Sequence, residues 1–175
     1  MKSISKNVVF LRVGIDRGAG GMAAPLFKDG SFEFVPIDAA WHKHGLTYGN
    51  TLGIKKKKPL IQYFPASRQK KMHNRAIHND PEFETFTYGD PTLPKQGLRR
   101  LERGDLLVLY CGLRGWNKCE APEALYIVGF FNIQIAGTYS SLVKDRGADW
   151  VKKLFSRNHH IIHGDVNGNS YKRTN

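Results

Sequence analysis

The chain has 175 residues, 41% of them hydrophobic and 24% charged, a composition typical of one globular domain and not of a disordered chain. The 27 Lys and Arg outnumber the 15 Asp and Glu, which gives a formal net charge of +12. An excess of this size on a small domain favours a polyanionic partner over a membrane, so we expect the partner to be a nucleic acid.

Strand-forming residues open the chain. Val, Phe, Leu and Ile dominate residues 7–15, a run too short for a helix and typical of a buried strand. This run leads into a glycine-rich loop at 16–21, where Gly permits backbone conformations that other residues avoid. Alternating residues at 31–37 predict a second strand, and Pro36 marks its end or an edge position.

A basic insert follows at residues 39–79, which contain nine Lys and Arg and no Asp or Glu. Its periodicity is poor, so we expect loops with short strand and helix pieces. Aromatic residues are interspersed among the cations, and rings can stack on bases while cations neutralise phosphates. A lysine run can also be an ordinary solvated surface. The residues that we expect to bind phosphate are Lys55, Lys56, Lys57, Lys58, Arg68, Lys70 and Lys71.

The second half of the chain predicts core strands and then a helix. Two apolar runs at 105–111 and 124–133 predict an antiparallel pair of core strands joined by a loop. Asp149 is the expected N-cap of an amphipathic helix. Residues 161–175 are polar and predict a tail, so we expect a single domain over residues 1–160 with an α+β fold.

The number of cysteines and the N-terminal sequence indicate the cellular compartment of the protein. Cys111 and Cys119 form no CxxC pair, and two cysteines do not suggest a disulfide framework. Arg12 interrupts the apolar run at 8–11, which is therefore too short for a signal peptide or a membrane span. We expect a cytoplasmic protein.

Asp16 stands where the first strand meets the glycine-rich loop, and three roles fit this position. A carboxylate at a strand end could bind a divalent metal, as in nucleases of the ribonuclease H type. The loop N–H groups could instead cradle a phosphate or a base, although no Gly-Lys-Ser/Thr of a Walker loop follows. The third possibility is a tight turn in which Asp16 bonds its own loop.

Histidines and acids form two further groups. His78 and Asp80 could act as an acid/base pair or bind a metal, but the candidate carboxylates Asp80, Asp90 and Asp105 have no recognisable spacing. A loop locked by Asx turns, with a buried Tyr88 hydroxyl, explains the same residues. The histidines at 159, 160 and 163 are more typical of chance surface residues than of a metal site, although His159 and His163 could face one way on a helix. No cofactor is predicted.

Three blocks of sequence together resemble a known family. The blocks are residues 12–37 with Gly14-Ile15-Asp16 and Asp29-Gly30, residues 78–90 with His78-Asn79-Asp80-Pro81 and Tyr88-Gly89-Asp90, and residues 101–131 with Gly104-Asp105 and Gly129. They resemble the third of the nucleotide modification associated domain families, over about residues 10–135. The last block also resembles the core of PUA-like folds, including the ASCH and EVE domains.

This resemblance implies both a fold and a function. The implied fold is a PUA-like, small, strongly bent β-barrel with peripheral helices. The implied function is recognition of a modified or flipped base within a modification or defence system. DNA is the expected target more than RNA. Aromatic rings would stack on the base and polar groups would bind its edge. The base-binding candidates are Asp16, Arg17, Tyr88, Asp90, Tyr110 and Trp116. The alternative is a base-modifying enzyme or a metal-dependent nuclease, with Asp16, His78, Asp80 and Asp90 as catalytic candidates.

Overall fold

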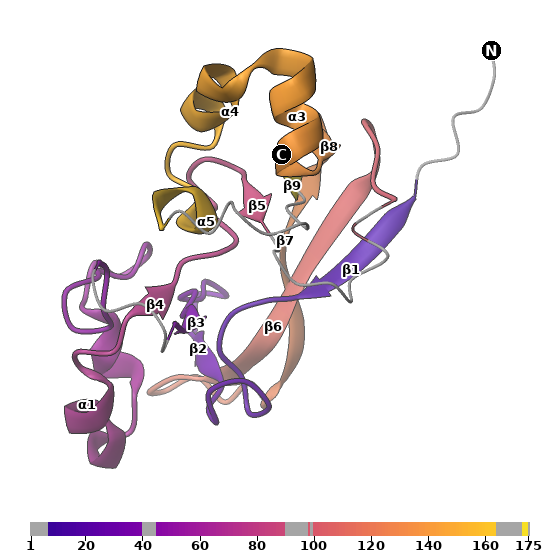
Figure 1. The fold of residues 1–175 in the computed structure, drawn as a ribbon. Helices are drawn as coiled ribbons and strands as arrows, with labels where there is room; N and C mark the ends of the chain where they lie inside the picture. The colour runs from indigo at the N-terminus through magenta and orange to yellow at the C-terminus, as the bar shows by residue number, and fades with distance from the viewer. Residues whose placement is uncertain (1–6, 40–44, 90–97, 99, 164–172, 175) are drawn as a thin grey trace. The chain divides into compact units, whose positions relative to one another are not determined.

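A computed structural model describes all residues except 1–6, 40–44, 90–97, 99, 164–172 and 175. Helices and strands both occur (Figure 1), so the α+β class is confirmed. The chain alternates between two compact units: unit 1 comprises residues 1–11, 79–109 and 129–175, and unit 2 comprises residues 12–78 and 110–128. The single domain expected over residues 1–160 stays a prediction.

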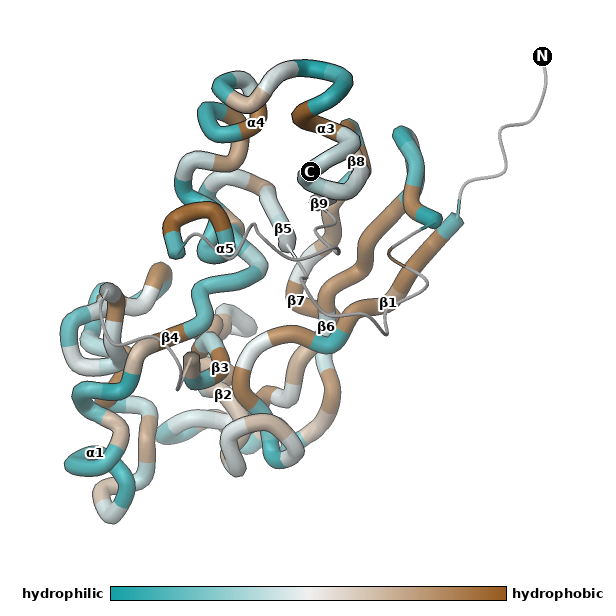
Figure 2. Tube along the Cα trace, in the orientation of Figure 1, coloured by the Kyte–Doolittle hydropathy of each residue, from teal (hydrophilic) through white to brown (hydrophobic). Residues whose placement is uncertain are grey.

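The longest strands are those that the apolar runs predicted. Strand β6 (Leu106–Gly115) pairs with β1 (Val8–Arg12), with β2 (Ala24–Leu26) and with β7 (Ala124–Asn132). Hydrophobic residues dominate β1 and β6 (Figure 2), and alternate side chains of β6, from Leu107 to Leu113, are almost fully buried. Burial of these alternate positions is what fixes the register of such a strand.

Unit 2 contains short elements besides its parts of the long strands. Strand β3 (Ile37–Asp38) is antiparallel to β4 (Ile77–His78). Between them lie the 3-10 helix η1 (Leu60–Tyr63) and helix α1 (Ala66–Met72), and the tube along α1 is mainly hydrophilic (Figure 2). This mixture of short pieces confirms the expectation for the basic insert.

The strand predicted at residues 31–37 is mostly absent. Only Ile37 belongs to a strand, and Phe32 forms a single bridge to Leu26. Pro36 has no N–H to donate, so a ladder cannot continue through that position.

Among its described residues, unit 1 combines a small sheet with helices near the C-terminal end of the chain. The small sheet is antiparallel and has the order β5 (Tyr88–Gly89), β9 (Arg173–Thr174), β8 (Ala136–Gly137). Part of the segment that we expected to be a tail, residues 173–174, is therefore paired in a sheet. The helices are α3 (Tyr139–Arg146), α4 (Ala148–Leu154) and α5 (His159–Ile162). Leu142, Val151 and Phe155 form the core between the first two helices.

Asp149 is not the N-cap of α4, so that prediction is wrong. Gly147 ends α3 and also caps α4, with a φ of +87° that is accessible to glycine at little cost. The chain therefore turns in one residue, and Asp149 lies in the first turn of α4, where its charge still favours the helix dipole.

In the part of the chain that the structure describes, the strands form three separate sheets of four, two and three strands and no closed barrel. Among the described helices, none combines the length and the apolar character that a membrane crossing requires. Both cysteines are free, and Cys111 is buried.

Candidate functional site

The lysine run forms a tight turn in unit 2, which we call the lysine turn (residues 53–58). A bridge between Leu52 and Pro59 closes its base, and the Gly53 N–H donates to the Lys58 carbonyl at 2.8 Å. Lys57 adopts a left-handed backbone with a φ of +53°. All four lysine side chains, from Lys55 to Lys58, are exposed, so the turn presents a compact group of cations to solvent.

A buried carboxylate binds the backbone of the lysine turn. Glu33 has an exposed fraction of 0%, and its two carboxylate oxygens accept the backbone N–H groups of Lys55 at 2.9 Å and Lys56 at 3.0 Å. The Tyr63 hydroxyl donates to the same carboxylate at 3.3 Å. A Cβ atom on Gly53 would lie 2.4 Å from Glu33 Cδ, so glycine is needed for this approach. The backbone of the turn is thus fixed by charge-assisted hydrogen bonds.

Most of these cations have no counter-ion. Lys56 Nζ lies 3.4 Å from the exposed Asp29 carboxylate. Within the described part of the chain, no ion pair involves Lys55, Lys57 or Lys58. Arg68, Lys70 and Lys71 of α1 likewise lack a carboxylate partner among the described residues, and the Arg68 guanidinium lies 5.7 Å from the ring of Phe64. Apart from Lys56, the predicted phosphate-binding residues therefore have no described carboxylate that would compete with a bound anion.

A row of three aromatic rings lies beside the lysine turn. Lys56 Nζ lies 4.6 Å from the centroid of the Phe27 ring, and Phe27 meets Tyr63 edge to face at 6.3 Å. Tyr63 in turn meets Trp116 at 5.5 Å. Burial, followed by the negative charge of Glu33, raises the pKa of Tyr63 to about 12. Trp116 ends the row and remains half-buried, so part of its ring is accessible.

The Asp16 side chain is occupied by its own loop. Asp16 is buried, and its Oδ1 accepts the backbone N–H groups of Gly18 at 2.7 Å and Ala19 at 2.8 Å. The Arg12 guanidinium binds the other oxygen. Burial, with the negative charge of Asp16 as a second cause, raises the pKa of Cys111 to about 12. This geometry favours the tight-turn role, while a metal-binding role stays a prediction.

Substitution of Asp16 separates these two roles. Because Asn keeps an acceptor oxygen for Gly18 and Ala19, we expect Asp16→Asn to reduce the unfolding free energy by only about 1 kcal/mol, whereas Asp16→Ala should cost about 2–3 kcal/mol. Urea denaturation of the two variants measures the difference. Equal losses in both variants would contradict the loop-locking role of the carboxylate.

The other predicted site residues are distributed over both units. In unit 2, the exposed Arg17 is paired with Glu123, and Tyr110 is half-buried on β6. His78 also belongs to unit 2, on strand β4. Tyr88 is buried on β5 of unit 1. Asp90 lies outside the described residues, and the convergence of these side chains on one base stays a prediction.

Unit 1 contains a buried cluster of polar residues. The predicted Asp80 is one member: its carboxylate accepts the Gly89 N–H at 3.2 Å and lies 3.6 Å from His160 Nε2. The Glu82 carboxylate accepts the backbone N–H of His159 at 2.7 Å and is also bonded by the hydroxyls of Thr85 and Thr87. These bonds tie α5 to the segment 80–89. We call Asp80, Glu82, Asn158, His159 and His160 the buried polar cluster.

Within this cluster, burial is the main cause of a shifted pKa at Glu82. It raises the pKa of Glu82 to about 7, and the negative charge of Asp80 acts in the same direction. The hydrogen bonds from Thr85, from Thr87 and from the His159 N–H oppose this shift because they stabilise the ionised carboxylate. Glu82 therefore changes its charge near neutral pH, unlike an exposed glutamate.

Comparison with known proteins places the chain in a family. The model of the family described as nucleotide modification associated domain 3 matches residues 7–173. This chain belongs to that family. The match confirms the resemblance seen in the sequence and extends it beyond residue 135 through the helices of unit 1. No curated protein and no solved structure gives a significant match.

Two residues of this nucleotide modification associated domain were misjudged from sequence. His159 and His160 were expected at the surface but are buried, with exposed fractions of 4% and 3%. Asn158 caps α5 by accepting the His160 N–H at 3.1 Å. The combination of an Asn cap with the apolar Ile161, which packs against the core of α3 and α4, was the available signal for a helix packed against a core. The rings of His159 and His163 lie 4.5 Å apart, so these two do face one way.

Proposed function

We propose that this member of the nucleotide modification associated domain 3 family binds nucleic acid through unit 2 and reads a modified or flipped base there. Its family membership associates it with nucleotide modification. The observation that carries the proposal is the lysine turn, held by the buried Glu33 beside an aromatic row. The modification or defence system would supply the modified strand.

The charge distribution supports unit 2 as the contact surface. Unit 2 carries 14 Lys and Arg against 6 Asp and Glu, while unit 1 carries 13 against 9. Each lysine that neutralises a phosphate releases a counter-ion, which supplies affinity without reference to sequence. Because Glu33 has already fixed the backbone of the lysine turn, binding does not require the turn to be ordered again.

The aromatic row supports a role for unit 2 in reading bases. Trp116 has accessible ring surface, and Lys56 joins the row to the lysine turn. A ring beside phosphate-binding cations is the usual arrangement for stacking on an unpaired base. We propose Asp16, Arg17 and Tyr110 of unit 2 as further contacts to the base, within a PUA-like fold.

Replacing three lysines of the turn tests the proposal. We expect the triple variant Lys55→Gln, Lys57→Gln and Lys58→Gln to weaken all duplexes alike and to reduce the slope of log affinity against log salt by about 2–3, since each phosphate contact contributes about 0.9. Fluorescence anisotropy with labelled DNA, over a series of salt concentrations, measures both effects. The variant leaves Lys56 and the anchoring Glu33 in place.

A matched variant in unit 1 provides the control. Lys144, Lys152 and Lys153 are exposed on α3 and α4, so their replacement by Gln removes the same charge. We expect little change in the salt slope of this control. An equal loss in both triple variants would show that net charge, and not the lysine turn, determines binding, and the proposal would then fail.

A further inference from the structure

Unit 1 contains a pocket that takes no part in the proposed interface. Its volume is about 310 Å³, at the lower end of the range for small-molecule sites. The apolar part of its lining consists of Leu101, Ile135, Ala136 and Leu142. Leu101 and Leu142 are buried, and Leu142 also belongs to the core of the helices α3 and α4, so this part of the wall is well supported.

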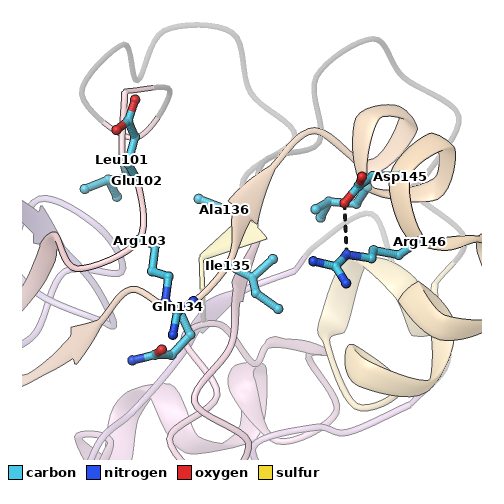
Figure 3. A pocket seen from close by; sticks show the side chains of 9 residues that line it. Leu101, Glu102, Arg103, Gln134, Ile135, Ala136, Asp145 and Arg146 are labelled. Atoms are coloured by element: carbon cyan, nitrogen blue, oxygen red, sulfur yellow. Dashed lines mark hydrogen bonds and ion pairs between the residues drawn. The ribbon is translucent and has the colours of Figure 1, made fainter.

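The polar lining includes one uncompensated cation. Figure 3 shows Arg103 and Gln134 side by side, with the Glu102 carboxylate pointing the opposite way. At the other side of the pocket, Arg146 Nε donates to Asp145 Oδ2 at 2.9 Å, so these two charges neutralise each other. Arg103 and Gln134 are both exposed, and among the residues that the structure describes neither side chain has a hydrogen-bond partner.

These groups define the chemistry of a ligand. A guanidinium without a partner offers a planar fork of donors that fits a phosphate or a carboxylate, and the neighbouring amide of Gln134 can add a donor. The apolar wall at Ile135 and Ala136 fits a flat, weakly polar body. Arg146 and Asp145 offer a donor and an acceptor that could bind the polar edge of such a body.

We propose that this pocket binds one nucleoside monophosphate, with its phosphate on Arg103 and its base against Ile135 and Ala136. The choice of a nucleotide over other organic anions follows from the family, which is associated with nucleotide modification. The site does not require the lysine turn, and it would hold one nucleotide unit, either free or at the end of a strand. A strand end and a free mononucleotide offer the same phosphate and base.

Calorimetric titration of the full chain tests this site. The probes are the four nucleoside 5′-monophosphates, the matching nucleosides and inorganic phosphate. We expect at least one monophosphate to bind more tightly than its nucleoside and than phosphate, since only the nucleotide engages both Arg103 and the apolar wall. Arg103→Ala should weaken that binding by about tenfold or more, the usual effect of losing one charge-assisted contact.

Two further variants test whether a loss of binding in Arg103→Ala comes from the pocket and not from a general change in charge or folding. Arg100→Ala removes an exposed arginine of the same stretch that does not line the pocket, and we expect it to leave the affinity unchanged. Ala136→Leu fills the wall without altering charge and should also prevent binding, with circular dichroism as the check on folding. Equal affinity for phosphate and nucleotides, or an unchanged affinity in Arg103→Ala, would overturn the proposal.

Two further measurements distinguish a strand end from a free nucleotide as the ligand and separate this pocket from the lysine turn. Competition by an oligonucleotide with a 5′-phosphate, but not by one without it, would assign the site to strand ends, and no competition would assign it to the free nucleotide. The triple variant of the lysine turn should bind the mononucleotide normally. A failure of polymer binding therefore leaves this inference standing, and its own failure leaves the polymer site standing.

Discussion

Glu33→Gln should weaken nucleic-acid binding by about tenfold, although it makes the protein more positive by one charge. The carboxylate of Glu33 holds the backbone N–H groups of Lys55 and Lys56. A glutamine amide can accept only one of them, and its NH2 group then faces the other donor. The lysine turn loses its fixed backbone, so binding has to pay the cost of ordering it.

The same substitution should lower stability. Glu33 is fully buried, and each hydrogen bond to a charged group contributes about 1.5–3 kcal/mol, so we expect a loss of about 2–4 kcal/mol in the unfolding free energy. Urea denaturation measures this loss, and fluorescence anisotropy with labelled duplex DNA at fixed salt measures the affinity at temperatures where the variant is folded.

Asp29→Asn is the matched control for this experiment. It also adds one positive charge, and it removes the exposed partner of Lys56 without touching the anchor of the turn. We expect its affinity to stay the same or to rise slightly, because surface ion pairs contribute little. If Glu33→Gln bound DNA as tightly as Asp29→Asn, charge alone would govern binding and the fixed turn would have no role.

The role of Glu33 could not be predicted from the sequence. The carboxylate lies 22 residues from the Lys55 N–H that it accepts, and no local pattern links the two positions. The lysine run itself was visible, because four consecutive cations in an acid-free span form a local signal. What the sequence lacked was the reason why this run forms a turn and not a flexible surface segment.

A similar contrast holds for the fold. Strands β6 and β7 were predictable because their apolar runs are long enough to identify a strand without tertiary information. The two-residue strands β3, β4 and β5 were not, because so short an element depends on its pairing partner. Tertiary contacts, and not propensity, define these parts of the chain.

The buried polar cluster shows the same limit in unit 1. The sequence drew attention to Asp80 through its neighbour His78, since histidine beside aspartate is a familiar acid/base pattern. In unit 1, the Asp80 carboxylate accepts the Gly89 N–H and lies 3.6 Å from His160 Nε2, and His160 is 80 residues further along the chain. A carboxylate and an imidazole that are both buried need each other as partners, so neither can be understood from its local sequence.

Glu82 gives this cluster a testable pH dependence. Its pKa is raised by burial from an ordinary value of 4.5 to about 7 in the folded protein. The folded state therefore binds the proton more tightly than the unfolded state does. This contribution to stability is fully present below about pH 4.5 and is lost as the pH rises to about 7, by up to about 3 kcal/mol.

Comparison with Glu82→Gln isolates the effect of Glu82 from that of every other titrating group, because both proteins share those groups. We expect the unfolding free energy of the wild type to fall relative to that of Glu82→Gln by about 2–3 kcal/mol between pH 4.5 and 7.5. Denaturant unfolding of both proteins at four pH values over this interval measures the difference.

An exposed neighbour supplies the control for this pH series. Glu84 lies 3.3 Å from Arg157 at the surface, so Glu84→Gln should differ from the wild type by less than about 0.5 kcal/mol at every pH. Parallel curves for the wild type and Glu82→Gln would mean that Glu82 is already ionised in the folded state. In that case, the bonds from Thr85, Thr87 and the His159 N–H, and not burial, would control its charge.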